Sequence, residues 1–158
     1  MEKAIATVML TVAGIVAIVT VINALMPAIS RTNASIVATS DSVDSRIATD
    51  LEIVHVSGND GTTSVDAWVK NTGAIRIAPV SRVDIFFGPA DDFVRIPYGE
   101  EGCISPCWYY TVENDAEWNP TATLHLTLST SLSLVLGETY YIKLVSPNGV
   151  TDARFFTI

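Results

Sequence analysis

The sequence predicts an α+β fold, in which a long N-terminal hydrophobic helix is followed by an all-β, immunoglobulin-like sandwich. The helix is predicted by the stretch from Ala4 to Ser30, which contains no charged residue although charged residues make up 16% of the 158-residue chain. The sandwich is predicted by the part beyond Asp50, where apolar and polar residues alternate in short runs that turn signals separate.

The uncharged stretch is long enough to cross a membrane. Positions 4 to 30 exceed the roughly 20 residues that an α-helix needs to span about 30 Å of hydrocarbon, and Ile, Leu and Val dominate them. Pro27 is expected to kink the helix or to end its most apolar part. The alternative is a cleaved secretory signal, whose apolar part is normally only about 7 to 15 residues long. We therefore expect insertion into a bilayer.

One side of the predicted helix carries small residues. At 100° per residue, five of them fall within about 60° of one another. They are Ala6, Ala13, Ala17, Thr20 and Ala24. Small side chains let helices approach closely in an apolar medium, which predicts packing against other helices. The alternative is that alanine is simply frequent in membrane spans.

The helical pattern continues beyond the uncharged stretch. Ile22, Ile29, Ile36 and Val43 recur every seven residues and predict a helix to about Ala48. The Ser, Thr and Asp residues of this part compete for backbone hydrogen bonds, so a partly ordered stalk is the alternative. We expect three parts: a transmembrane or filament-core helix over 1–30, a helical continuation or stalk over 31–49, and an extracytoplasmic β-sandwich domain over 50–158.

The part from 50 to 158 is long enough to bury one core. Leu124, Leu126 and Leu128 alternate with polar residues, and the alternation recurs around Ile142, which predicts half-buried antiparallel strands. Further strands are expected at 51–56, 64–70, 82–87, 93–98, 108–112, 132–136 and 150–158. Turn signals such as Asn59-Asp60-Gly61 separate them at a spacing typical of sandwiches with Greek-key connections.

The two cysteines, Cys103 and Cys107, are separated by three residues, of which Pro106 is the last. This spacing predicts a small disulfide-closed loop and an exterior compartment; two buried free thiols and redox catalysis are the alternatives. Asn33-Ala34-Ser35 is an N-glycosylation acceptor pattern, consistent with the same side. The short basic N-terminal flank, with Lys3, favours the N-terminus inside and the head outside.

No catalytic constellation is legible in the sequence. The two histidines, His55 and His125, read as surface or satisfied strand residues, and we expect no enzyme and no cofactor. The net charge of −8 without a basic patch argues against nucleic-acid binding. Acidic loop residues supply oxygen ligands that Ca²⁺ prefers, but their spacing matches no calcium loop, so we expect solvated loop charge, with a structural cation site as the alternative. They are Asp91, Asp92, Glu100, Glu101, Glu113, Asp115 and Glu117.

Several segments in order resemble a known family. Residues 45–54 are similar to the Thr-Asp-hydrophobic-Glu/Lys-Ile segment that opens the β-domain in archaeal flagellar proteins of the FlaG/FlaF class. Residues 69–73, Val-Lys-Asn-Thr-Gly, and 83–86, Val-Asp-Ile-Phe, continue the resemblance, and 147–151 look like the final hairpin of flagellin-like relatives. The architecture is also similar to that of archaellins and type IV pilin-like filament subunits.

The resemblance implies a structural part of the archaellum, the archaeal flagellum. In the stator class, a membrane helix and external sandwiches anchor the motor, which implies self-association and contacts with other archaellum proteins or with the surface-layer protein. An archaellin or pilus-like subunit that polymerises through its helix is the alternative. Met1-Glu2-Lys3 offers almost no leader, which favours the stator interpretation. A membrane-anchored receptor or lipoprotein would need a ligand pocket or a cysteine near the helix, and neither cysteine lies there.

Overall fold

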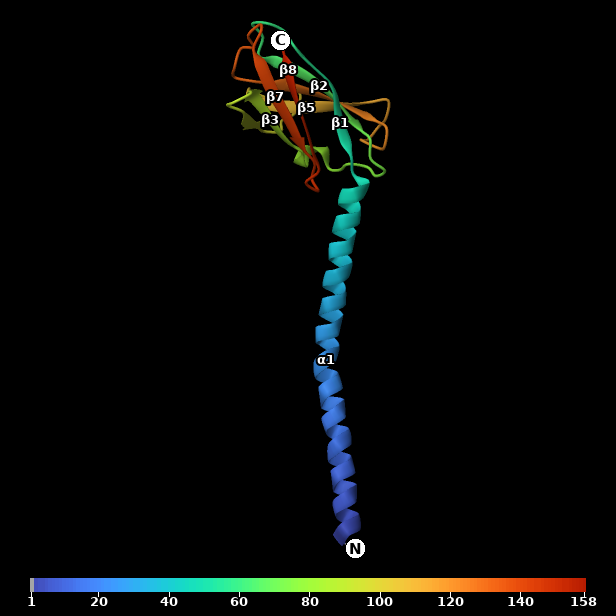
Figure 1. Ribbon diagram of the computed structural model, residues 1–158. Coiled ribbons are helices and arrows are strands. Elements are labelled where there is room, and N and C mark those ends of the chain that lie inside the picture. Colours follow the sequence, from blue (N-terminus) through green and yellow to red (C-terminus); the bar gives the residue numbers. More distant parts are fainter. Residues whose placement is uncertain (1) are drawn as a thin grey trace. The chain divides into compact units, whose positions relative to one another are not determined.

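The computed structural model describes residues 2–158 and divides the chain into two compact units (Figure 1). The first unit runs up to Val43, and the second is Asp44–Ile158. The first unit and the beginning of the second form α1, Glu2–Ala48, a continuous helix that runs through Pro27. The helix predicted to about Ala48 is confirmed, and Pro27 does not end it, because the missing N–H removes only one bond of a long ladder.

Eight strands follow α1 in the second unit. Their bounds are β1 Leu51–Gly58, β2 Ser64–Asn71, β3 Asp84–Pro89, β4 Val94–Ile96, β5 Cys107–Glu113, β6 Thr123–Ser129, β7 Thr139–Val145 and β8 Thr151–Thr157. One turn of 3₁₀-helix, Val80–Arg82, precedes β3. The strand predicted from residue 82 therefore begins two residues later.

The strands form two antiparallel sheets of four strands each. The order is β1-β2-β6-β5 in the first sheet and β4-β3-β7-β8 in the second. The chain crosses between the sheets after β2, β4 and β6, so that β2 pairs with β6 and β3 with β7. This is the A-B-E-D and C′-C-F-G arrangement of immunoglobulin-like domains, which confirms the predicted sandwich with Greek-key connections.

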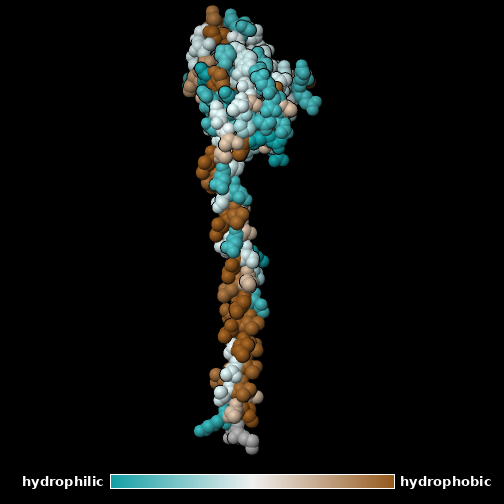
Figure 2. All heavy atoms as spheres, turned by 90° about the vertical axis from the view of Figure 1, so that its right-hand side faces the viewer, coloured by the Kyte–Doolittle hydropathy of each residue, from teal (hydrophilic) through white to brown (hydrophobic). Residues whose placement is uncertain are grey.

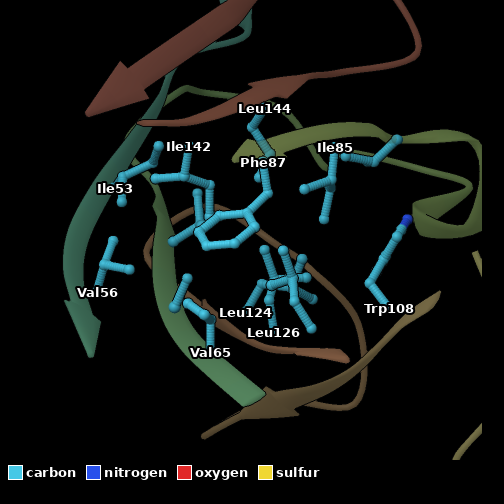
Figure 3. Packing of buried hydrophobic residues seen from close by; sticks show 14 of the residues in the cluster. Ile53, Val56, Val65, Ile85, Phe87, Trp108, Leu124, Leu126, Ile142 and Leu144 are labelled. Atoms are coloured by element: carbon cyan, nitrogen blue, oxygen red, sulfur yellow. The ribbon is translucent and has the colours of Figure 1, made fainter. Parts of the chain in front are cut away.

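The core lies between the two sheets, where the inward side chains of both meet (Figure 3). Leu124, Leu126 and Leu128 of β6 are fully buried, as their alternation predicts. From the second sheet, Phe87 of β3 and Ile142 of β7 pack against them. Burying large apolar side chains of this kind stabilises a fold by about 1.5–3 kcal/mol each, so this cluster fixes which face of every strand points to solvent.

The predicted strand over residues 132–136 is wrong. These residues form an irregular connection from β6 to β7, and Leu134 is buried while Leu132, Val135 and Leu136 are exposed. The Leu134 N–H donates to the Thr62 carbonyl at 2.8 Å, and its carbonyl accepts from the Gly61 N–H at 2.9 Å. The segment carries the chain from one sheet to the other, so tertiary position overrides its apolar, strand-like composition.

Two charged side chains of β8 close one edge of the sandwich. Asp152 and Arg154 sit in the inward phase of this edge strand, opposite Leu144 and Ile142. Asp152 Oδ2 accepts from the Ile53 N–H at 2.7 Å, and Arg154 Nη1 donates to the carbonyls of Ile53 and Val54 at 2.9 and 2.7 Å. The bulge of β1 at this point turns its backbone toward them. The β1 edge is therefore occupied by side chains of the other sheet.

Candidate functional site

The apolar surface of α1 is uncovered in the single chain. Its large apolar side chains, from Ile5 to Ile47, are exposed by 48 to 78%. Figure 2 shows brown apolar atoms along the helix, joined by more hydrophilic ones in its later part. By length and composition this is a helix that could cross a membrane, and none of its most apolar window is buried. Water is a poor solvent for so much apolar surface, so lipid or other helices have to cover it.

The threonine hydroxyls of α1 are bonded within the helix. Thr7 Oγ1 donates to the Lys3 carbonyl at 2.9 Å, Thr11 Oγ1 to the Val8 carbonyl at 2.8 Å, and Thr20 Oγ1 to the Val16 carbonyl at 2.8 Å. A hydroxyl that is satisfied in this way needs no partner from its surroundings. These threonines are thus compatible with an apolar environment.

The predicted small-residue stripe lies on α1 and is exposed along its whole length. Its members are Ala6, Ala13, Ala17, Thr20 and Ala24. A Cβ added at nearby Gly14 would meet no atom within 4 Å, so the helix surface is open there too. The role of this stripe in helix packing stays a prediction.

Helix length limits how much of α1 a bilayer can cover. With 47 residues at about 1.5 Å each, α1 is roughly 70 Å long, more than twice the ~30 Å of a hydrocarbon layer. Ile36 and Val37 lie beyond the uncharged stretch and remain 58% and 59% exposed. Asn33, the predicted glycosylation residue, is exposed in the same part, and its modification stays a prediction.

The last turn of α1 belongs to the sandwich unit, and two separate segments hold it there. Asn148, in the turn between β7 and β8, donates Nδ2 to Thr49 Oγ1 at 2.6 Å and to the Ser45 carbonyl at 3.2 Å. The Ala74 N–H donates to the Ala48 carbonyl at 2.8 Å, which satisfies one of the free carbonyls at the helix end. The end of α1 is therefore bonded to the β2–β3 connection and to the β7–β8 turn.

The β2–β3 connection is shaped around the start of β1. Thr72 Oγ1 donates to Asp50 Oδ2 at 2.9 Å, and the N–H groups of Thr72 and Gly73 both donate to the Asp50 carbonyl. A Cβ added at Gly73 would lie 2.4 Å from the Asp50 nitrogen and 2.7 Å from the Ala48 carbonyl oxygen. Only glycine therefore fits beside this backbone without a shift.

Asn71 bridges three segments from a fully buried position. Its Nδ2 donates to the carbonyls of Ile75 and Trp118 at 2.9 and 3.1 Å, and its Oδ1 accepts from the Gly73 N–H at 3.0 Å. The segments that carried the family resemblance, around Asp50, Asn71 and Asn148, thus meet at one end of the sandwich. Sequence reasoning identified them only as turn signals and a family pattern, because their contacts appear once the strands are paired.

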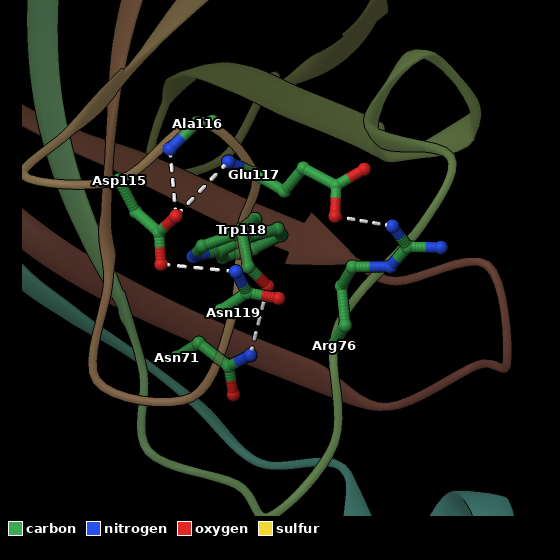
Figure 4. Close-up of polar contacts among 7 residues, drawn as sticks. All are labelled: Asn71, Arg76, Asp115, Ala116, Glu117, Trp118 and Asn119. Atoms are coloured by element: carbon green, nitrogen blue, oxygen red, sulfur yellow. Dashed lines mark hydrogen bonds and ion pairs between the residues drawn. The ribbon is translucent and has the colours of Figure 1, made fainter.

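The neighbouring turn after β5 holds two of the acidic loop residues, Asp115 and Glu117 (Figure 4). Asp115 accepts from Asn119 Nδ2 at 2.9 Å and from the Ala116 N–H at 2.6 Å, and these hydrogen bonds hold the pKa of its carboxyl below the usual value. Glu117 pairs with Arg76. These acids are therefore engaged with protein groups.

The acidic residues that could serve as metal ligands lie in separate turns and loops. Within residues 2–158, the structure has no group of three or more His, Cys, Asp or Glu side chains placed to hold a metal ion. Asp91 and Asp92 lie in the β3–β4 turn, while Glu100 and Glu101 lie in the loop before β5. A calcium site thus finds no support in the geometry of the described residues.

Cys103 and Cys107 form a disulfide, with their Cα atoms 6.3 Å apart. It closes a loop that displays Ile104, which is 92% exposed. A Cβ added at Gly99 would lie 2.6 Å from the Cys103 Cβ, so the preceding segment packs directly against the bridge. Beside it, burial raises the pKa of Tyr98, and Tyr110 and Glu100 raise it further. The loop presents a shaped surface rather than reactive thiols.

Both histidines of the chain flank one tryptophan on the outer face of the first sheet. The ring of Trp68 is stacked on His125 with centroids 4.6 Å apart, and His55 lies on its other side at 5.5 Å. Trp68 Nε1 donates to Glu113 Oε1 at 3.1 Å, and His125 Nε2 lies 3.1 Å from Asp66 Oδ1. The outward position of His125 is as its strand phase predicts. The grouping of Trp68 with the two histidines was not predicted, because it depends on the pairing of β1, β2 and β6.

Comparisons with known proteins agree over nearly the whole chain. The model of the family described as archaeal-type flagellin matches residues 2–154. An uncharacterized protein of Archaeoglobus fulgidus is 28% identical over 164 residues, an alignment that covers 99% of this chain and 98% of that protein.

The similar solved structures include stator proteins and a flagellum. The archaellum periplasmic stator protein FlaG from Sulfolobus acidocaldarius is 24% identical with a TM-score of 0.59, and covers 68% of this chain and 99% of its own. In the FlaF and FlaG stator complex of the same organism, the identity is 25% and the TM-score 0.58, over 67% of this chain and 87% of that one. The archaeal flagellum of Methanospirillum hungatei is 15% identical with a TM-score of 0.56, over 92% of this chain and 91% of its own.

Proposed function

Because the chain belongs to the archaeal-type flagellin family, we propose that this non-enzymatic structural protein anchors the archaellum motor in the cell envelope. The observation that carries the proposal is the 25% identity with the periplasmic stator complex of FlaF and FlaG, at a TM-score of 0.58. In this proposal residues 1–30 lie in the membrane, 31–49 continue the helix outside it, and 50–158 form an extracytoplasmic domain. Torque from a motor must react against a fixed structure, and a membrane helix joined to an external sandwich can supply one.

The hydrogen bonds between the end of α1 and the sandwich support a mechanical role. A load that passes along the end of α1 reaches β1 directly and, through Asn148 and Ala74, also reaches the β7–β8 turn and the β2–β3 connection. Several hydrogen bonds share the load, each contributing about 1 kcal/mol. The partners we propose are the membrane, other archaellum proteins including further copies of this chain, and the surface-layer protein.

A second candidate function is that of a filament subunit. The similarity to the Methanospirillum hungatei flagellum covers 92% of this chain, and so includes helix as well as sandwich. At roughly 70 Å, α1 is longer than a bilayer is thick, and its apolar residues beyond the uncharged stretch would be covered in a bundle of many copies. In this candidate the small-residue stripe packs helices in the filament core.

Fractionation of the native cell surface tests the two functions. Filaments are sheared from cells and examined by electron microscopy, and mass spectrometry then quantifies the chain in filaments and in the remaining envelopes. The stator proposal expects the chain in the envelope fraction, enriched with motor proteins after mild detergent extraction. A chain that makes up a main part of the filament mass overturns the stator proposal and supports the filament subunit.

A further inference from the structure

The edge of the first sheet at β5 is open beyond its first residues. β5 pairs with β6 on one side only. On its other side, the Trp108 N–H donates to the Pro97 carbonyl at 3.0 Å, and the Trp108 carbonyl accepts from the Gly99 N–H at 2.8 Å. Since backbone groups alternate in direction along a strand, those of Tyr110 and Val112 face the same side as those of Trp108. Within residues 2–158 they have no hydrogen-bond partner.

The core of the sandwich is incompletely covered at this edge. Leu126 and Leu124 of β6, which pair with Tyr110 and Val112, are fully buried, whereas Tyr110 and Val112 are only half-buried. Both of these β5 residues pack against the core and also line a cavity of about 340 Å³. This volume lies within the roughly 300–1,000 Å³ of cavities that bind ligands. The free edge of β5 therefore lies beside an open part of the core.

The other walls of this cavity come from the β2–β3 connection and from the turn after β5. Ile77 and Pro79 are apolar residues of these walls, and the two charged residues, Arg76 and Glu117, pair with each other (Figure 4). Trp118 also lines the cavity, and its Nε1 is a buried donor without a partner among the described residues. Because buried donors normally have a partner, an uncharged molecule with a hydrogen-bond acceptor fits these walls.

The other three sheet edges carry features that discourage pairing with a further strand. β4 has only three residues. At the β1 edge, the backbone of Ile53 is already bonded to the side chains of Asp152 and Arg154. These two charged side chains lie in the inward phase of β8, which is itself a known protection of an edge strand. The part of β5 beyond Trp108 has none of these features.

We propose that a short, extended and uncharged segment of a partner protein adds to the β5 edge and places an apolar side chain in the cavity. We call this segment the added strand. Its backbone bonds the free N–H and C=O groups of Tyr110 and Val112, and every second side chain points to the core side, where the cavity lies. A small molecule could fill the cavity, but only another backbone also pairs with the alternating donors and acceptors of the edge.

The added strand is short and comes from a different protein. Residues 97–99 cover the start of β5, and the strand ends at Glu113, which limits the free stretch to its second half. The strands of a second copy are already paired within its own two sheets. The contact needs only the sandwich unit, so it is independent of whether α1 lies in a membrane or in a filament core.

Hydrogen exchange of single amides tests this contact in the full chain in detergent. The probes are four acetylated and amidated pentapeptides in which Thr flanks a central Ala, Val, Leu or Phe, each added at millimolar concentration. We expect at least one peptide to slow the exchange of the Tyr110 and Val112 N–H groups at least fivefold and to shift the indole resonance of Trp118. The Ala153 N–H, which by the same alternation faces the open side of β8, is the control and should not change.

Three results of this measurement would overturn the proposal. The first is that none of the four peptides protects Tyr110 and Val112, and the second is that Ala153 is protected equally. The third is protection without any peptide that increases with the concentration of the chain, which would place a second copy at the edge. All three leave the proposed function standing, because that function is tested by where the chain fractionates.

Peptides with a modified backbone test whether the segment pairs as a strand. Two forms of the best peptide carry N-methyl groups on alternate residues, one form on each phase. Only one phase faces β5 in an added strand, so one form should lose the protection of Tyr110 and Val112 at least fivefold and the other should keep it. Equal protection by both forms would show binding in the cavity without strand addition and contradict the proposal.

Variants that fill the cavity test where the apolar side chain goes. Ala116→Trp and Ser81→Trp introduce a large side chain from two different walls, and each should weaken the protection by the best peptide at least fivefold. Ser133→Trp, on an exposed loop outside the cavity, is the matched control and should keep it. Folding is checked by the exchange of the buried Leu126 N–H, and a filled variant that fails this check is replaced by the other. Full protection in a folded Ala116→Trp or Ser81→Trp chain would refute the proposal.

Discussion

Replacing Asn71 should test whether the buried bridge beside the helix end stabilises the sandwich. Asn71→Ala removes two hydrogen bonds to the carbonyls of Ile75 and Trp118 and one from the Gly73 N–H, all from a side chain with no exposed surface. Each unpaired buried group costs about 1–3 kcal/mol, and the Ile75 carbonyl lies in a part-buried position that water can reach. We therefore expect a loss of about 3 kcal/mol in the free energy of unfolding.

The companion change Asn71→Asp sharpens the test. It keeps the acceptor for Gly73 but turns a carboxylate toward two carbonyl oxygens, so at pH 7 it should destabilise more than Asn71→Ala. At acid pH the protonated carboxyl can donate to one carbonyl, and part of the loss should be recovered. Asn59→Ala, in the exposed β1–β2 turn, is the control and should change the stability by less than about 0.5 kcal/mol.

The assay is urea unfolding of the full chain in detergent, followed by tryptophan fluorescence. Trp108 and Trp118 are buried in the sandwich, so their emission reports its unfolding. By thermal unfolding, 3 kcal/mol corresponds to a fall of about 12 °C or more in Tm for a domain of about 100 residues. An Asn71→Ala variant within 1 kcal/mol of the unmodified chain would refute the reasoning, as would an Asn71→Asp variant more stable than Asn71→Ala at pH 7.

Three further predictions concern α1, the disulfide and a surface carboxyl. Ala13→Leu with Ala17→Leu fills the small-residue stripe and should lower helix association at least tenfold by energy transfer in liposomes, whereas Val8→Leu with Val19→Leu, on the other side of α1, should leave it within twofold. Cys103→Ser with Cys107→Ser should cost about 2 kcal/mol or less in chemical unfolding, because the loop is short, but should speed proteolysis within residues 99–106; a larger loss would assign the bridge a role in the core. Because the hydrogen bond from Asn119, and next that from the Ala116 N–H, lower the pKa of Asp115, its contribution to stability is present above the unfolded-state pKa and is lost as pH falls through the folded one. Asn119→Ala should raise the pKa of Asp115 in a carboxyl ¹³C NMR titration, and an unchanged value would contradict the assigned cause.

Local patterns predicted the strands that bury one of their two faces in the core. The alternation around Leu124, Leu126 and Leu128 identifies β6 because every second side chain enters the core. The pattern over 132–136 failed because four of these five residues are apolar but only Leu134 is buried. The passage of α1 through Pro27 was also not predictable, because the cost of one missing bond depends on the stability of the helix on both sides.

The candidate site depends on contacts that no local pattern contains. Asn71 reads as part of a turn signal, and its partner Trp118 is 47 residues away, on a loop that pairing of β2 with β6 brings alongside. In the same way His125 can be placed on the polar side of its strand, but its position between Asp66 and Trp68 follows from the register of two strand pairs. The family resemblance identified the junction segments without showing that they touch.

The closure of the β1 edge by Asp152 and Arg154 determines how the sandwich responds to tension. A pull that enters at Leu51 and is directed along β1 would shear all of the cross-strand bonds to β2 together instead of breaking them one after another. The bonds from β8 to the backbone of Ile53 and Val54 add a second strand to the resistance, on the opposite sheet. Under load the domain should yield late and abruptly rather than creep, and Arg154→Ala should lower its rupture force in single-molecule stretching.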